Sequence, residues 1–249
     1  MSKPILGEPV LKLPSVDSTN NYASVLLAKG EAKEGTVILA DYQTHGKGHA
    51  GNVWFSETGK NLLCSIILQP KFLLAERQFF LSMCVSNALH QLVSGYAGSV
   101  RIKWPNDMLI DRKKVAGILI ENTIIGRWLN TTVIGIGLNV NQESFPAHLA
   151  NPVSIREITG NHHDIAEIFS GLLQALTLHV EKLYSEQYAD IKTHYLNNLF
   201  GLNTWEVYTD ASGTFEGRIT DVADSGELMV VKRNGEVKFY GFKEIAYKT

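Results

Sequence analysis

Residues 101–121 read RIKWPNDMLIDRKKVAGILIE, and this stretch decides the fold class. Pro105 cannot donate a hydrogen bond to a neighbouring strand, and Asn106 and Asp107 suit a turn, so the first apolar run ends here. Apolar runs separated by polar turns continue along the chain, which predicts consecutive strands at 99–104, 107–111, 115–122 and 127–140. The sequence therefore predicts several neighbouring strands of one sheet.

Helical and strand patterns surround this stretch on both sides. Strands are predicted at 35–43 and 61–69, and helices at 18–29, 76–94, 164–187 and from there to Phe200. After Gly201 the pattern changes to short alternating segments between glycine-containing turns, at 204–209, 214–222, 227–232 and 236–240. We expect an α+β fold in which helices pack on a sheet within residues 1–200, followed by a small β-barrel in residues 201–249.

Composition limits the functions that the chain can have. Its 249 residues are 45% hydrophobic and 19% charged, which is enough for a large core, and the formal charge of −2 disfavours a nucleic-acid partner. No apolar run approaches the ~18 residues of a membrane span, and the N-terminus lacks the apolar region of a signal peptide. We therefore expect a cytoplasmic protein with no membrane partner, in which Cys64 and Cys84 are reduced core residues.

A glycine-rich loop, THGKGHAGNVW at 44–54, follows the strand predicted at 35–43. Its three glycines are Gly46, Gly48 and Gly51, and Lys47 and His49 stand between them. The glycines let backbone N–H groups approach a ligand, and the basic residues add positive charge, so the loop suits a carboxylate or phosphate. It is neither a P-loop nor a dinucleotide fingerprint, because the glycine spacing differs. A flexible surface loop without a ligand explains this stretch equally well.

Two stretches at the predicted hairpin carry charge beside apolar residues. Lys103 lies next to Trp104, and Asp107 begins the following strand. Gly117 interrupts an apolar strand, as glycine does where a ligand or another backbone comes close, and Lys114 is the cation at that place. Each stretch has a structural alternative: a β-turn with the indole in the core, and a solvated lysine turn with an incidental glycine.

In their order and spacing, these motifs resemble those of biotin protein ligases. The matching stretches are STN at 18–20, GKGHAG at 46–51 with Trp54, KWPND at 103–107, KVAGILIE at 114–121, GIGLNVN at 135–141 and SIREITG at 154–160. The resemblance implies a class II synthetase-like catalytic domain with helices on a mixed sheet, followed by an SH3-like barrel. It is closest to the short form of the family, which lacks an N-terminal winged helix.

The resemblance implies a two-step ligase. Such enzymes join biotin to ATP, release pyrophosphate, and pass the biotinyl group from the adenylate to one lysine of a biotin carboxyl carrier domain of a carboxylase. ATP and Mg²⁺ are the expected cosubstrate and activator, biotin is the expected substrate, and homodimers are common in the family. We predict no structural metal site, because the histidines of NHHD lack a third ligand at short spacing and precede a helix that Asn161 or Asp164 could cap.

The resemblance also implies roles for individual residues. Lys114 would contact the biotin carboxylate and the α-phosphate, with Lys103 adding positive potential and Asp107 orienting or deprotonating the carrier lysine. The expected biotin-binding residues are Ser18, Thr19, Asn20, Gln43, Gly46, Lys47, Gly48, Lys114 and Gly117. The expected nucleotide-binding residues are Lys47, His49, Trp54, Lys103, Asn106, Asp107, Lys114 and Asn139. Trp54 would close over adenine and the Asn139 amide would read it, although a turn residue ending a strand is the alternative for Asn139.

The glycine loop departs from the family pattern at three positions. Lys47, His49 and Asn52 stand where arginines are common in the family. Lysine lacks the bidentate guanidinium, asparagine lacks the charge, and histidine is charged only at lower pH. Because this loop folds over the activated intermediate in the family, we expect weaker retention of biotinyl-AMP here.

Three other functions compete with this interpretation. A lipoate ligase or octanoyl transferase shares the general plan and a comparable lysine, but KWPND, the glycine loop and the trailing barrel favour biotin. A biotin-responsive repressor needs a winged helix, for which there is no room before Leu13. A non-catalytic adaptor that docks partners through its barrel is disfavoured by the presence of Lys114 and Asp107.

Overall fold

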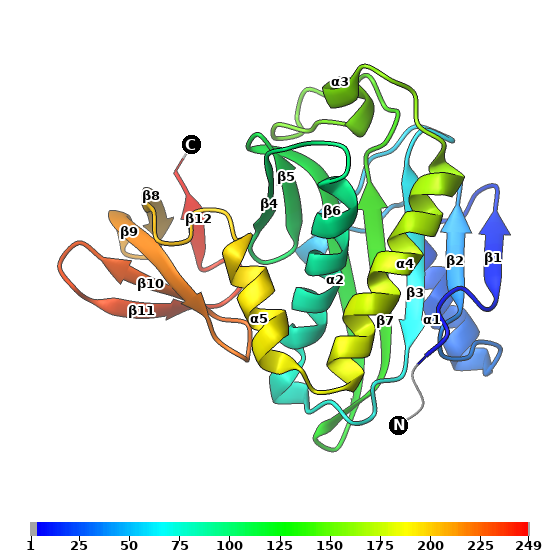
Figure 1. Ribbon diagram of the computed structural model, residues 1–249, viewed down its shortest axis with the longest axis horizontal. Coiled ribbons are helices and arrows are strands. Elements are labelled where there is room, and N and C mark those ends of the chain that lie inside the picture. The colour runs from blue at the N-terminus through cyan, green and yellow to red at the C-terminus, as the bar shows by residue number, and fades with distance from the viewer. Residues whose placement is uncertain (1–3, 249) are drawn as a thin grey trace.

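The computed structural model describes residues 4–248 and contains two β-sheets (Figure 1). The larger sheet has seven strands in the order β1-β2-β3-β7-β6-β5-β4. β1 is parallel to β2 and the other neighbouring strands are antiparallel, so the sheet is mixed. The strands are β1 Val10–Leu13, β2 Val37–Ala40, β3 Leu62–Leu68, β4 Val100–Lys103, β5 Asp107–Ile110, β6 Lys113–Ile125 and β7 Trp128–Leu138.

The hairpin of β5 and β6 forms as its sequence predicts. Asp111 and Arg112 make its two-residue turn with φ angles of 46° and 65°. These left-handed conformations match the twist of the two strands. A register shift, at which Val115 of β6 is the extra residue, then places Asp107 opposite Gly117. β6 is longer than the predicted 115–122, because its pairing with β7 continues past the apolar run into exposed residues.

Helices cover both faces of the larger sheet (Figure 1). α2 and α4 pack against one face and against each other, and α5 lies beside α2. α1 packs on the opposite face against β2, β3 and β7. The helices are α1 Thr19–Lys29, α2 Phe79–Val93, α3 Ile155–Thr159, α4 Ile165–Tyr184 and α5 Tyr188–Asn197.

Local signals set two of the predicted helix ends. α1 stops at Gly30, whose φ of 69° is the left-handed conformation that glycine adopts without a side-chain clash. Asp164 accepts a hydrogen bond from the backbone N–H of Ala166 at 2.7 Å and so caps α4, as one of the two predicted alternatives. The predicted helix 76–94 is wrong at its start, because residues 75–77 form a separate 3-10 turn before α2.

A second, antiparallel sheet of five strands forms the C-terminal part, in the order β11-β10-β9-β8-β12. Its strands are β8 Trp205–Asp210, β9 Gly213–Val222, β10 Leu228–Lys232, β11 Val237–Tyr240 and β12 Ile245–Tyr247. Four of them coincide with predicted segments, and β12 was not predicted. The α+β class, with helices on a mixed sheet followed by a small β-structure, is confirmed. A domain boundary between residues 200 and 201 remains our proposal.

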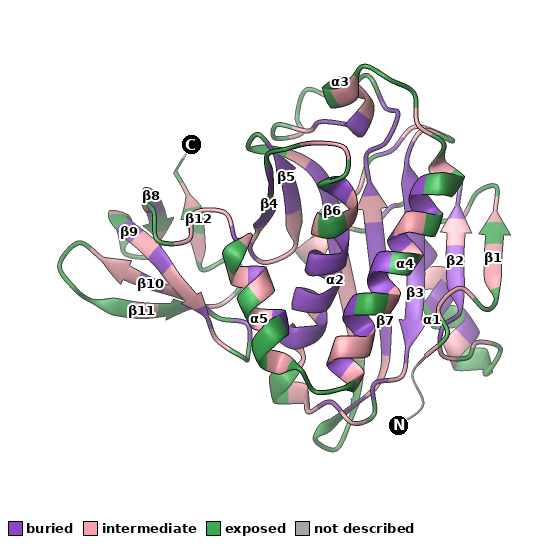
Figure 2. Cartoon of the chain, in the orientation of Figure 1, coloured by how far each residue is buried: buried purple, intermediate pink, exposed green. Residues whose placement is uncertain are grey.

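The main core lies between the larger sheet and the layer of α2 and α4 (Figure 2). Cys64 on β3 and Cys84 on α2 are free thiols that are completely buried in it. Burial raises the pKa of the Cys64 thiol to about 12, so it stays protonated and inert. Both cysteines are therefore core residues, as predicted. Within residues 4–248, no helix combines the length and the apolar character that crossing a membrane requires.

Three histidines gather where α2, α4 and α5 meet. The ring centroids of His179 and His194 are 5.5 Å apart, and those of His90 and His194 are 6.1 Å apart. Burial, followed by the charges of His194, Lys182 and His90, lowers the pKa of His179 to about 4. Burial also lowers the pKa of His90 and of His194. The folded protein therefore keeps this cluster neutral at physiological pH.

We expect the protein to lose stability as the pH falls from about 6.5 to 4. In this window the unfolded chain protonates position 179 while the folded chain does not, so the unfolded state binds more protons. His179→Gln should reduce the loss of unfolding free energy between pH 7.5 and 5 by about 1 kcal/mol. Urea titrations at the two pH values measure this, with the exposed His148→Gln as control. An unchanged pH dependence in His179→Gln would contradict the assignment.

Candidate functional site

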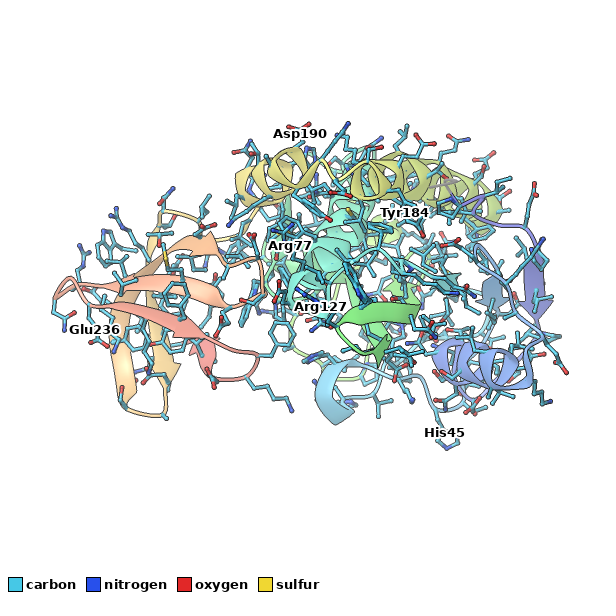
Figure 3. All side chains as sticks on the ribbon, turned by 90° about the horizontal axis from the view of Figure 1, so that it is seen from below. His45, Arg77, Arg127, Tyr184, Asp190 and Glu236 are labelled. Atoms are coloured by element: carbon cyan, nitrogen blue, oxygen red, sulfur yellow. The ribbon has the colours of Figure 1, made fainter. Side chains whose placement is uncertain are left out.

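A cavity opens on the α1 face of the larger sheet, lined by both polar side chains and glycines. The start of α1, the glycine loop, β6 and β7 surround it. In Figure 3 His45, which precedes the glycines of the loop, lies on the side of α1, opposite Tyr184 and Asp190 of the helix layer. The predicted site residues that line the cavity are Ser18, Thr19, Asn20, Gln43, Lys47, Gly48, His49, Trp54, Asn106, Lys114 and Gly117.

Glycines on two paired strands form the floor of this cavity. Gly117 on β6 is the partner of Gly137 on β7, and Cβ atoms there would lie 3.0 Å and 2.4 Å from the indole of Trp54. A Cβ at Gly135 would lie 2.3 Å from Oδ1 of Asn20. The absent side chains therefore let other groups lie directly on the sheet. Sequence reasoning found Gly117 but missed the other two, although their spacing of two residues along a strand places them on one face.

A chain of hydrogen bonds joins the start of α1 to the sheet. The side-chain oxygen of Gln43 accepts hydrogen bonds from Thr19 N and Oγ1 at 2.8 and 3.1 Å. The hydroxyl of Ser65 lies 2.7 Å from Thr19 Oγ1 and 2.6 Å from Asn20 Oδ1, and the Asn20 amide donates to Glu121 Oε2 at 2.7 Å. Ser65 and Glu121 were not predicted. A polar residue inside an apolar strand was the available signal for Ser65.

Lys114 and Asp107 form an ion pair beside the cavity. Nζ lies 2.6 Å from Oδ1, and the two side chains are 36% and 22% exposed. The same Nζ lies 5.6 Å from the ring centroid of Trp54, and the backbone N–H of Lys114 donates to the carbonyl of Asn151. The predicted cation and carboxylate thus face one place, with the cation held between a carboxylate and an aromatic ring.

The glycine loop is ordered into a short hairpin over the cavity. The N–H of Gly48 donates to the carbonyl of Asn52 at 2.7 Å, and residues 49–51 form a 3-10 turn at the tip. A Cβ at Gly46 would lie 2.5 Å from the backbone oxygen of Trp54, so glycine is required where the two arms meet. Gly46 therefore shapes the loop and is not among the residues that line the cavity.

The three positions at which the loop departs from the family pattern have different surroundings. Lys47 Nζ lies 3.5 Å from Glu121 Oε1 in an ion pair that is about two-fifths exposed on each side, so it adds little stability. The ring of His49 packs edge-on against Phe242, which lies in the turn between β11 and β12, with centroids 5.3 Å apart. Asn52 is exposed. The loop is thus held at both an acidic and an aromatic contact.

A second cavity lies between the two sheets and adjoins the first. Lys103 and Asp107 line it from the larger sheet, and Tyr247 lines it from the smaller one. Lys103 Nζ lies 5.6 Å from the ring centroid of Tyr247. The residues that line both cavities are Gly48, His49, Trp54, Asn106 and Lys114. Four cations, Lys47, Lys103, Lys114 and Lys243, and the carboxylate of Asp107 therefore border the two adjoining cavities.

The KWPND stretch is held from both sides. The side-chain amide of Asn106 donates to the carbonyl of Ile118 at 2.8 Å, and Ile118 N donates back to the carbonyl of Asn106 at 2.9 Å. Trp104 is buried and its indole N–H donates to the carbonyl of Gly226 at 2.9 Å. The structural alternative for Trp104, in which its indole lies in the core, is thus correct. Lys103 and Asn106 on either side of it nevertheless line the cavities.

Asn139, like Gly46, is a predicted site residue that lines neither cavity. Its side-chain amide donates to the carbonyl of Val153 at 3.0 Å, and the residue is almost completely buried at the end of β7. Its Oδ1 is buried without a hydrogen-bond partner. In this structure Asn139 directly follows the last residue of β7, which agrees with the alternative of a turn residue that ends a strand.

Known proteins match the chain over most of its length. The model of the biotin/lipoate A/B protein ligase family matches residues 13–139, just over half of the chain. The chain belongs to this family. The ligase/repressor BirA of Bacillus spizizenii is 33% identical over 244 residues, which cover 95% of this chain and 73% of that protein. The biotin–[acetyl-CoA-carboxylase] ligase of Paracoccus denitrificans is 29% identical over 225 residues, which cover 88% and 92%.

Solved structures of biotin/lipoate family members share the fold of both sheets. The biotin protein ligase from Aquifex aeolicus in complex with biotin and ATP has a TM-score of 0.80 at 24% identity, over 97% of this chain and 99% of that chain. The family residues include the start of α1, the glycine loop, KWPND and the glycine floor. The resemblance predicted from those motifs is therefore confirmed.

Proposed function

We propose that this protein is a biotin protein ligase, which joins biotin to ATP and then transfers the biotinyl group to a lysine of a carrier domain. The observation that carries the proposal is the Lys114–Asp107 ion pair, located between a glycine-floored cavity and a second, adjoining cavity. Membership of the family and the biotin ligases among its relatives support the same reaction. The expected carrier is the biotin carboxyl carrier domain of a biotin-dependent carboxylase.

In the first step, a biotin carboxylate oxygen attacks the α-phosphorus of ATP, the bond to the β-phosphate oxygen breaks, and pyrophosphate leaves. Both reactants are anions, so cations must offset their repulsion and the charge that develops in the transition state. Lys114 lies where it can contact both reactants, while Lys47 and Lys103 border the two cavities from opposite sides. Mg²⁺ would enter with the triphosphate, because it usually binds through substrate phosphates and keeps several waters.

The ureido ring of biotin needs one hydrogen-bond acceptor for each N–H group and a donor for its carbonyl. Ser18, Thr19, Asn20 and Gln43 provide such groups at one end of the first cavity. The bonds of Thr19 to Gln43 and the contacts of Ser65 orient these side chains before the ligand binds. Preorganised polar groups favour biotin over acids that carry only an aliphatic chain, because burying unpaired groups is costly.

In the second step, the amine of the carrier lysine attacks the carbonyl carbon of the adenylate, the bond to the phosphate oxygen breaks, and AMP leaves. The amine must lose a proton, and a free lysine is mostly protonated at pH 7. Asp107 lines the second cavity next to Lys114, so its carboxylate can accept that proton while Lys114 stays with the AMP phosphate.

Transfer to defined carriers tests the function. Purified protein with MgATP is given labelled biotin and a biotin carboxyl carrier domain, or labelled lipoate and a lipoyl domain. We expect label on the first carrier and none after its acceptor lysine is replaced by arginine. Labelling of the lipoyl domain instead would assign the lipoate branch of the family, and no product with either carrier would favour the adaptor.

Gly137→Ala should weaken biotin binding by about 10- to 100-fold. The new Cβ would lie 2.4 Å from Trp54, so the indole must move and the floor of the cavity must rise. Titration calorimetry with biotin measures the effect. Gly98→Ala is the matched control, because a Cβ there meets nothing within 4 Å and the backbone needs no left-handed φ. Equal affinities of the two variants would show that this floor does not hold the ligand.

A further inference from the structure

Phe242 connects the second sheet to the two motifs of the site. It lies in the turn between β11 and β12, and its side chain is 44% exposed. Its ring centroid is 5.3 Å from that of Trp104 in KWPND and 5.3 Å from that of His49 in the glycine loop. One aromatic ring from the C-terminal part therefore touches both motifs at once.

Phe242 rests on a base of buried aromatic residues. Trp104 is 8% exposed and its indole N–H is hydrogen-bonded to Gly226 of the second sheet. Phe79 at the start of α2 is buried and lies 6.2 Å from Phe242 between ring centroids. A Cβ at Gly226 would lie 2.6 Å from Phe79, so the two sheets meet closely here. Phe242 is thus fixed on one side by groups that belong to the core.

On its other side, Phe242 contacts the tip of the glycine loop. His49 is the first residue of the 3-10 turn and lines both cavities of the site. The hydrogen bonds of Gly48 N to Asn52 and of Trp54 N to Gly46 close the hairpin of the loop and break when it opens, and the exposed Lys47–Glu121 ion pair holds one arm of it. The His49–Phe242 contact joins that tip to the buried aromatic base. Its position is one at which the family commonly has arginine.

We propose that Phe242 is a positioning residue that holds the glycine loop closed over the site through the ring of His49. The inference rests on the proposed function for its effect on the adenylate, since a loop held closed slows the escape of biotinyl-AMP. The chemistry of adenylation does not involve this ring. Loss of the ring therefore accelerates loop opening and intermediate release while leaving the maximal rate of pyrophosphate exchange unchanged.

Two readouts separate loop position from activity. Hydrogen exchange of the Gly48 and Trp54 amides in the unliganded protein reports loop opening without any ligand. The dissociation rate of biotinyl-AMP, chased with excess biotin, reports retention. For Phe242→Ala we expect both rates to rise by about 2- to 10-fold, the size of an edge-to-face aromatic contact. Phe242→Tyr, which keeps the ring, should restore both rates.

Phe239→Ala is the matched control, because Phe239 is a half-exposed aromatic residue of β11 in the same small sheet. It should leave both rates at wild-type values. If Phe242→Ala does not fold, His49→Ala removes the same contact from the side of the loop. Exchange of the Gly48 and Trp54 amides in that variant should then rise by the same factor of about 2 to 10. In a double-mutant cycle, the two substitutions should not be additive.

The inference is overturned if the loop amides exchange in Phe242→Ala, or in His49→Ala, at the rate seen in Phe239→Ala. It is also overturned if exchange rises equally across the larger sheet, since that would show only a structural role. Faster loop exchange in a protein that forms no adenylate with biotin would support the positioning role and refute the proposed function.

Discussion

Lys114→Ala should lower biotin-dependent ATP–pyrophosphate exchange by about 100- to 1000-fold, because one preorganised charge at the reacting centre is removed. The wild-type ammonium lies 2.6 Å from Asp107 and faces both cavities. Without it, the Asp107 carboxylate loses its partner and adds to the repulsion between biotin carboxylate and triphosphate. The substitution thus removes an attraction and exposes a repulsion at the same place.

The neighbouring lysine supplies a matched control for this result. Lys113 is exposed and adjacent to Lys114 on β6, where successive side chains point to opposite faces. Lys113→Ala should therefore exchange pyrophosphate within about twofold of the wild type, as surface substitutions usually do. Lys114→Arg keeps the charge but changes its shape, and should give an intermediate rate. Exchange in Lys114→Ala as fast as in Lys113→Ala would remove Lys114 from the mechanism.

Asp107→Asn should separate the two half-reactions. Transfer from preformed biotinyl-AMP to the carrier should fall by about 100-fold or more, the usual contribution of a general base, whereas pyrophosphate exchange should change by only a few-fold. The amide keeps the shape of the carboxylate and leaves Lys114 charged, but it cannot accept the proton of the attacking amine. Single-turnover transfer measures this step.

The pH dependence and a control on the same hairpin sharpen the Asp107 result. Transfer by Asp107→Asn should rise about tenfold per pH unit below the pKa of the carrier lysine, because the neutral amine becomes more abundant. Asp111→Asn should behave as wild type, since this exposed turn residue has a φ of 46° that asparagine also tolerates. An equal loss of both half-reactions in Asp107→Asn would mean that Asp107 acts only by holding Lys114.

The parts of the fold that sequence reasoning predicted are those whose local signals agree with their surroundings. The β5–β6 hairpin combines a two-residue turn of left-handed residues with apolar runs on both sides. β1 and β12 were missed because they are strands of four and three residues with few buried side chains. α3 was missed although Ser154 and Glu157 form a capping box, a signal that was present in SIREITG.

The residues of the candidate site likewise divide into those that a local sequence pattern reveals and those that it does not. Lys114, Asp107 and the glycine loop could be predicted because unusual residues stand inside otherwise regular patterns. Glu121 could not, since it acts through Asn20, which is distant in the sequence, whereas the polar Ser65 inside an apolar strand was a signal that was not used. The contact of Phe242 with the loop depends on how the two sheets meet, and no local pattern of one segment encodes that.

The measurement that tests the central claim most directly is ATP–pyrophosphate exchange by the unaltered protein with Mg²⁺ and one of three acids: biotin, lipoate or octanoate. A biotin protein ligase must activate its acid before transfer, so the exchange isolates the first step from the choice of carrier. We predict exchange that requires biotin and is at background with the other two acids. Exchange driven by lipoate or octanoate but not by biotin would contradict the account.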